Sequence, residues 1–136
     1  MTNETSNYQR EIVELHQFFV DWYIGELAKT DAAFARFADV MADNFAIVHP
    51  GGVIIERDSL FENIYNTHNQ RPGFRIWIEN VELRHHDGNI LVVSYEEWQV
   101  VNDDKPTTRL STVIFRENDD APNGLQWLHV HETWMK

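Results

Sequence analysis

Cysteine is absent from the 136-residue sequence, so the chain forms no disulfide and offers no thiol nucleophile or thiolate metal ligand. Basic residues are also scarce: 11 Lys and Arg stand against 22 Asp and Glu, which gives a formal net charge of −11. Such a charge repels phosphate backbones and excludes nucleic acid as the expected partner. The lack of cysteine fits a cytoplasmic protein, and we expect this location.

Long apolar runs are missing too. None approaches the ~18–20 residues of a membrane span, so no membrane partner is expected. The N-terminal stretch MTNETSNYQRE has neither the basic nor the apolar region of a signal peptide. Repeats and linkers are absent as well, and we expect residues 1–136 to form a single domain. The hydrophobic fraction of 43% is sufficient for an ordinary globular core.

The first half of the chain carries three helical patterns. Ser6 to Gln9 has the spacing of a capping box, and Asp31 and Ser59 are placed to cap two further helices. After the first cap, apolar residues recur at three- and four-residue steps, as on a helix with one buried face. They are Tyr8, Ile12, Leu15, Phe19, Trp22, Tyr23 and Leu27. Between the second and third helices, a short strand from Phe45 to His49 and another from Val53 to Ile55 flank a Pro-Gly-Gly turn.

After Pro72-Gly73 the apolar period changes from about 3.6 to 2, which is typical of strands. The predicted strands are Phe74–His86, Ile90–Val101, Thr107–Arg116 and Leu125–Met135. Asp87-Gly88 predicts the first hairpin turn. We therefore expect an α+β fold in which three N-terminal helices pack on a strongly curved, mainly antiparallel sheet. A four-strand C-terminal meander and the short early strands form this sheet, and a cavity opens between the sheet and the long helix.

Both faces of the predicted strands are substantially apolar. In a sheet with one solvated face, apolar and polar residues would alternate along each strand more regularly. We therefore expect one face to cover the cavity and the other to contact a second copy, forming a homodimer. On the cavity face we place Glu96 and Trp98 of one strand, Arg109 of the next, and Glu132 and Trp134 of the last.

The order of these motifs resembles the NTF2-like superfamily, whose fold is the cystatin-like α+β cone. YIGELAKTD and FADVMADNFAIVHPGG look like the opening of ketosteroid isomerases and SnoaL-like cyclases. SLFENIY and LQWLHVHET are similar to segments of the association domain of calcium/calmodulin-dependent kinase. TTRLSTVIF, followed by HVHET, looks like the SnoaL-like and DUF4440-type groups of small bacterial proteins. The resemblance covers essentially the whole chain and implies the cone fold.

The resemblance to ketosteroid isomerases also suggests catalytic positions. His49 stands where that family has its proton-shuttling carboxylate, and Tyr23 matches its oxyanion-stabilising tyrosine. The third participant of the family, a protonated Asp, corresponds to about Val113 and is missing. An imidazole and a phenol can still abstract a proton beside a carbonyl and stabilise the oxyanion. Alternatively, His49 caps the strand and Tyr23 belongs to the helix core.

Arg109, Glu96 and Glu132 allow two interpretations. They form either a buried ion network or, through the guanidinium, an anchor for a ligand carboxylate. In the kinase association domain an arginine stands at the position of Glu132, so the charge there is reversed. The remaining side chains that we expect in the pocket complete the predicted ligand site. They are Trp22, Tyr65, Trp98, Ser111, Val113 and Trp134, with core packing as the alternative for the two helical aromatics, Trp22 and Tyr65.

His129 and His131 lie on one face of the last strand, about 6–7 Å apart. This spacing suits a metal only if a third ligand approaches, and the sequence fixes none. In similar families this strand packs its histidines on the dimer face. No metal and no cofactor are therefore expected.

The predicted function is the binding of a small, partly hydrophobic organic molecule in an apolar pocket. If the protein is an enzyme, the expected reaction is a cofactor-independent isomerisation, cyclisation or hydration by proton transfer. In that mechanism His49 is the base, Tyr23 donates a hydrogen bond, and Arg109 and Trp98 orient the substrate. The alternative function is a non-catalytic ligand sensor or an assembly module resembling the kinase association domain.

Overall fold

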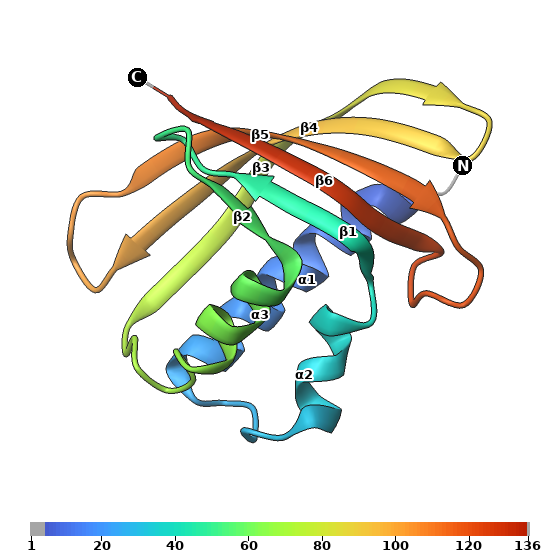
Figure 1. The fold of residues 1–136 in the computed structure, drawn as a ribbon. Helices are drawn as coiled ribbons and strands as arrows, with labels where there is room; N and C mark the ends of the chain where they lie inside the picture. The colour runs from blue at the N-terminus through green and yellow to red at the C-terminus, as the bar shows by residue number, and fades with distance from the viewer. Residues whose placement is uncertain (1–4, 136) are drawn as a thin grey trace.

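The computed structural model describes residues 5–135, which form three helices on one side of a six-stranded mixed sheet (Figure 1). The sheet is open and curves over the helices. The predicted α+β class, with three N-terminal helices and a cone-like sheet, is confirmed. Within the described residues, no helix combines the length and the apolarity that crossing a bilayer requires.

Helix α1 spans Asn7–Ile24 and begins as the sequence predicts. The Ser6 hydroxyl caps it by accepting a hydrogen bond from the backbone N–H of Gln9, at 3.3 Å. The helix ends at Ile24, three residues before the apolar stripe does, because Gly25 adopts a φ of +87° that stops the helix. A Cβ at this glycine would also lie only 2.4 Å from Asn69 Oδ1.

The caps of the two short helices differ from the prediction. Helix α2 spans Asp31–Ala38, and Thr30 caps it by accepting from Ala33 N at 3.1 Å, so Asp31 is the first helical residue instead of the cap. Helix α3 spans Arg57–Tyr65, and Ser59 therefore lies inside it. The predicted capping box at Ser59 is wrong because a short strand runs directly into the helix, so that Glu56, three residues before Ser59, takes the cap position.

The predicted meander is confirmed, since each of its strands pairs with its sequence neighbour. The strands are β1 Met41–Val48, β2 Ile54–Glu56, β3 Phe74–Asp87, β4 Ile90–Val101, β5 Thr107–Glu117 and β6 Leu125–Trp134. Their order in the sheet is β2-β1-β6-β5-β4-β3, and β1 is parallel to β6. The hairpin between β3 and β4 turns on Gly88 and Asn89, with Gly88 at a φ of +58°.

Aromatic side chains make up much of the core on both the helical side and the sheet side. Phe18, Trp22, Phe34 and Phe37 of α1 and α2 contact one another with ring centroids 5.0 to 6.1 Å apart. On the sheet side, Trp127 packs edge-on against Phe115 at 4.8 Å.

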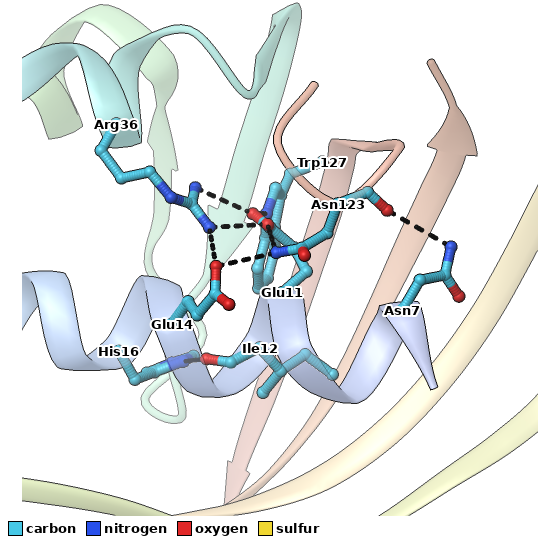
Figure 2. Close-up of polar contacts among 8 residues, drawn as sticks. All are labelled: Asn7, Glu11, Ile12, Glu14, His16, Arg36, Asn123 and Trp127. Atoms are coloured by element: carbon cyan, nitrogen blue, oxygen red, sulfur yellow. Dashed lines mark hydrogen bonds and ion pairs between the residues drawn. The ribbon is translucent and has the colours of Figure 1, made fainter. Parts of the chain in front are cut away.

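A buried carboxylate joins α1 to three other parts of the chain (Figure 2). Glu11 has no exposed surface, and both of its oxygens accept hydrogen bonds from the Arg36 guanidinium, at 2.7 and 3.2 Å. The indole N–H of Trp127 donates to it at 2.8 Å and the Asn123 amide at 3.0 Å. Because four donors surround it, this charge is compensated within the protein and connects α1 with α2, β6 and the loop before β6.

Candidate functional site

A cavity of about 460 Å³ lies between the helices and the sheet. Most of its wall is apolar. The apolar lining residues are Leu15, Phe19, Phe37, Met41, Phe45, Ile47, Ile55, Leu60, Ile64, Phe74, Ile76, Trp127 and Val130. Polar side chains from α1, β4, β5 and β6 line one continuous part of this wall. A cavity with apolar walls and a few grouped polar side chains is typical of small-molecule sites.

The first polar group is a buried ion pair between α1 and β4. His16 Nε2 lies 2.9 Å from Glu97 Oε1, and His16 Nδ1 lies 2.7 Å from the Ile12 carbonyl oxygen. Both ring nitrogens therefore face acceptors, which requires an imidazolium that donates from each. Burial alone would lower the pKa of His16, but the Glu97 carboxylate outweighs it and the pKa is raised. The Gln99 amide donates to the other Glu97 oxygen.

The second polar group connects β5 and β6. Arg109 Nη1 donates to Glu132 Oε1 at 3.1 Å, and the Ser111 hydroxyl lies 3.4 Å from Glu132 Oε2. The guanidinium carbon of Arg109 also lies 4.8 Å from the centre of the Trp134 ring, in a cation–π contact. Arg109 Nε is buried, and no described residue accepts its hydrogen bond. An unpartnered buried donor of this kind costs about 1–3 kcal/mol unless a bound molecule supplies the acceptor.

The two cavity carboxyls have opposite protonation tendencies. Burial would raise the pKa of Glu97, but His16, Arg109 and Gln99 outweigh it and lower the pKa to about 2. Burial and the nearby Glu97 charge raise the pKa of Glu132, and Arg109 only partly opposes this. Glu97 is thus held ionised, while Glu132 is the carboxyl that more readily carries a proton.

Tyr23 and Arg71 meet on the helical side of the cavity. The Arg71 guanidinium carbon lies 4.7 Å from the Tyr23 ring centre and 5.5 Å from that of Phe74. Burial raises the pKa of the Tyr23 hydroxyl, and the neighbouring Arg71 charge only partly opposes this. The phenol therefore stays protonated at neutral pH.

His49 lines the cavity at the exit of β1. A tight turn fixes its backbone, because its N–H donates to the Val53 carbonyl and its own carbonyl accepts from Gly52 N–H, both at 2.8 Å. Burial and the positive charge of Arg109 lower the pKa of the imidazole. His49 is therefore neutral at pH 7 and able to accept a proton.

The predicted site residues fall into four places, of which the outer face of β4 is described below. Tyr23, His49, Arg109, Glu132 and Trp134 line the cavity. Ser111 and Val113 share the inner face of β5 with Arg109 but are buried in the core. Trp22 and Tyr65 are not in the cavity wall. They pack against each other at 5.4 Å in the helical core, where the Trp22 indole N–H donates to the Ile64 carbonyl.

The face predicted for β4 is wrong. In the observed register, Arg109 lies opposite Glu97, and the side chains of β4 that line the cavity are Tyr95, Glu97 and Gln99. Glu96 and Trp98 point to the other face, where Trp98 stacks on Trp77 at 5.8 Å and its indole N–H donates to Glu96. Each face of β4 carries one glutamate and one large aromatic residue, so alternation alone could not distinguish them.

Sequence reasoning missed His16, Glu97, Gln99 and Arg71. A signal for His16 was present, because it follows Ile12 by four residues and so falls on the apolar stripe of α1. A titratable side chain on that stripe must be either paired or functional. Glu97 would have been identified if the opposite face of β4 had been assigned to the cavity.

His129 and His131 lie on the outer face of β6, beside Ala46 and Val48 of β1. Across residues 5–135, no three His, Asp or Glu side chains come together in a group able to hold a metal ion.

Comparison with known proteins gives one family. The sucrose-6-phosphate phosphohydrolase C-terminal family model matches residues 8–136. A curated relative, sucrose-phosphatase 1 of Nicotiana tabacum, is 26% identical over 128 residues, covering 93% of this chain but 30% of that protein. The chain thus spans about a third of the length of the curated relatives it matches.

Solved structures agree with the fold. An NTF-2 like protein of unknown function from Pseudomonas aeruginosa superposes with a TM-score of 0.84 at 29% identity, covering 96% of this chain and 99% of that one. The CaMKII hub of S. rosetta superposes with a TM-score of 0.65 at 13% identity, covering 99% and 100%, and this shows a shared fold alone. The predicted NTF2-like superfamily is confirmed.

Proposed function

This chain belongs to the sucrose-6-phosphate phosphohydrolase C-terminal family, and we propose that it binds a small organic molecule in the cavity between its helices and sheet. The observation that carries this proposal is the arrangement of the cavity wall. A mostly apolar surface surrounds one group of polar side chains, including an arginine whose buried Nε has no acceptor among residues 5–135. Apolar walls give affinity, and a few polar groups fix the orientation of a ligand.

The family supplies the first ligands to test. Its curated relatives are named sucrose-phosphatases, so sucrose and sucrose 6-phosphate head the set, followed by small ketones and carboxylates. Aromatic rings such as Tyr23, Trp127 and Trp134 offer flat apolar surfaces for a ring-shaped ligand.

Thermal unfolding and calorimetric titration test this proposal. A ligand present at 100 times its dissociation constant stabilises the folded protein by about 2.7 kcal/mol. Arg109→Met should weaken binding, whereas Arg116→Met is the matched control, because Arg116 lies on the same strand and bonds Gln126 away from the cavity. If none of these compounds binds, or if both variants behave alike, the cavity is not the ligand site.

A catalytic form of the proposal uses His49 as base and Tyr23 as hydrogen-bond donor. It is supported by the shared cavity and by pKa values that keep His49 neutral and the Tyr23 phenol protonated. His49→Gln should then abolish turnover of a bound ketone while leaving its dissociation constant within about threefold. Unchanged turnover in that variant would leave a binding site without this chemistry.

A second candidate function is assembly with another copy of this chain through the outer face of the sheet. Apolar side chains on that face remain half-buried or exposed: Val92, Trp98, Leu110 and Ile114. Such a surface on one side of a sheet favours a self-complementary dimer. A light-scattering mass of one chain at micromolar concentration would exclude it.

A further inference from the structure

The hydrogen-bonding groups of the cavity are not balanced. Both oxygens of Glu97 already accept bonds, from His16 and Gln99, and both oxygens of Glu132 face donors, Arg109 and Ser111. The carboxylate oxygens therefore have little remaining capacity to accept hydrogen bonds from a ligand.

The cations of the cavity are less well satisfied. Arg109 uses Nη1 for Glu132, while its Nε is buried without an acceptor among the described residues. Arg71, which is exposed, lies over two aromatic rings and adds a second positive charge to the cavity wall. Because donors and positive charge are in surplus, the best complement is a ligand rich in acceptors and negatively charged.

We infer that the cavity ligand carries an oxyanion, a carboxylate or a phosphate, which binds Arg109, and that its binding is coupled to proton uptake by Glu132. This inference rests on the proposed function, since it defines the chemical class of the molecule in the same cavity. The proton comes from solvent and protonates a Glu132 oxygen, so the site accepts a second anion without holding two adjacent uncompensated charges.

The groups around Glu132 explain why it takes the proton. Arg109 is its cationic partner on β5, and Glu97 on β4 and His16 on α1 also act on it electrostatically. Glu97 is held ionised by His16, so it is not the carboxyl that responds. An oxyanion on Arg109 adds negative charge beside Glu132 and competes for its cation, and both effects favour the protonated acid.

The other charged groups leave this assignment unchanged. Tyr95 is buried near both carboxyls, and its hydroxyl stays protonated because burial raises its pKa well above the ordinary value. His49 also faces Arg109, and burial together with this positive charge lowers the pKa of its imidazole, which favours the neutral form.

Calorimetric titration with matched probes tests the inference. Phenylacetate is the carboxylate, phenyl phosphate the phosphate and phenylacetamide the neutral isostere. Titrations of phenylacetate at about pH 6 in two buffers of different ionisation enthalpy give the number of protons taken up per bound ligand, because phenyl phosphate itself titrates near this pH. We expect at least one oxyanion to bind tenfold or more tightly than the amide, with measurable uptake of up to one proton. The stronger of the two anions identifies the carboxylate or phosphate preference.

Two variants separate the parts of the inference. Glu132→Gln keeps the shape and acceptor of the side chain, and it should bind the anion without proton uptake and with little pH dependence. Arg109→Met should lose the preference for the anion over the amide, while Arg116→Met should keep it. The uptake measurement on the unaltered protein does not depend on either variant folding.

The possible failures are distinguishable. Binding of the amide as tightly as both anions, or anion binding without proton uptake, would overturn the inference and leave the proposed function intact. Proton uptake that persists in a folded Glu132→Gln protein would also overturn it. If neither these probes nor the sugars bind, the proposed function itself fails.

Discussion

At the scale of single residues, three buried glutamates have different bonding partners in this chain. Glu11 is surrounded by donors from three other segments, Glu97 is paired with a histidine, and Glu132 is paired with an arginine. All three have at most 5% of their surface exposed. A carboxylate is buried only where its charge is compensated, so each should respond differently to substitution.

Glu11→Gln should destabilise the protein by about 3 kcal/mol, because it removes the buried charged partner of Arg36 and replaces one acceptor oxygen by a donor. The free energy of unfolding in urea measures this. Glu14→Gln is the control, since Glu14 contacts Arg36 and Asn123 but its side chain is 50% exposed. A loss below about 0.5 kcal/mol is expected there. Equal losses of unfolding free energy in both variants would show that the contribution of Glu11 does not depend on its burial.

The ion pair of His16 and Glu97 should make stability depend on pH. The pKa of Glu97 is lowered from 4.5 to about 2, so its contribution is present above about pH 4.5 and is lost as the pH falls toward 2. His16 has a raised pKa, so its contribution is complete below 6.5 and is lost as the pH rises through the folded-state value. The pair therefore contributes most between these limits.

Glu97→Gln should lower the free energy of unfolding by about 3 kcal/mol near pH 6, because the imidazolium loses its partner. The difference between the unaltered protein and this variant should shrink as the pH falls below about 4.5. Urea unfolding at several pH values measures it. A difference that stays constant down to about pH 2 would mean that Glu97 is not held ionised by His16.

Most of the polar site could not be read from the sequence because its residues come together only through the register of the sheet. Arg109 and Glu132 were found, since alternation on β5 and β6 gave their faces correctly. Glu97 was missed because β4 has similar polarity on both faces. The apolar stripe of α1 marked His16 as unusual, but its partner Glu97 is 81 residues away, so the pair itself could not be read from the sequence.

At the scale of helices and strands, sequence patterns predicted nearly every element and were weakest at the ends. Strand β4 has the predicted bounds, and the start of α1 follows its capping serine. Errors arose where two residues competed for one role, as Thr30 and Asp31 do at the start of α2. Both types are good caps, and the backbone geometry decides between them.

Thr30→Ala should destabilise the protein by about 1 kcal/mol, because the Ala33 N–H loses its acceptor at the first turn of α2. Asp31→Ala should cost less, about 0.3–0.5 kcal/mol, since it removes only a favourable charge near the positive end of a helix. Urea unfolding of the two variants compares them directly. A larger loss of unfolding free energy in Asp31→Ala than in Thr30→Ala would indicate that Asp31 is the cap.

At the scale of the whole molecule, the sheet presents two unlike surfaces. Its inner face holds the polar side chains of the cavity, and its outer face carries apolar residues without a helix over them in the described part of the chain (Figure 1). This explains why the strands looked apolar on both faces in the sequence. The family match, in contrast, came from similarity along the whole chain, and no single motif predicted it.

The outer face gives the last prediction, that this chain forms a dimer through β4, β5 and β6. Leu110 lies on this face with 39% of its surface exposed, between Glu96 of β4 and Thr133 of β6. Leu110→Glu places a charge in the apolar face, beside the Glu96 carboxylate, so it should shift a dimer to monomer at micromolar concentration.

Sedimentation equilibrium of both proteins gives the masses. Val13→Glu is the matched control, because Val13 is 46% exposed on α1, on the helical side of the molecule, and its substitution should leave the dimer intact. Dissociation by both variants would point to general destabilisation. A monomeric unaltered protein, or a Leu110→Glu protein that remains dimeric, would place any self-association elsewhere, and the apolar outer face would then need a different partner.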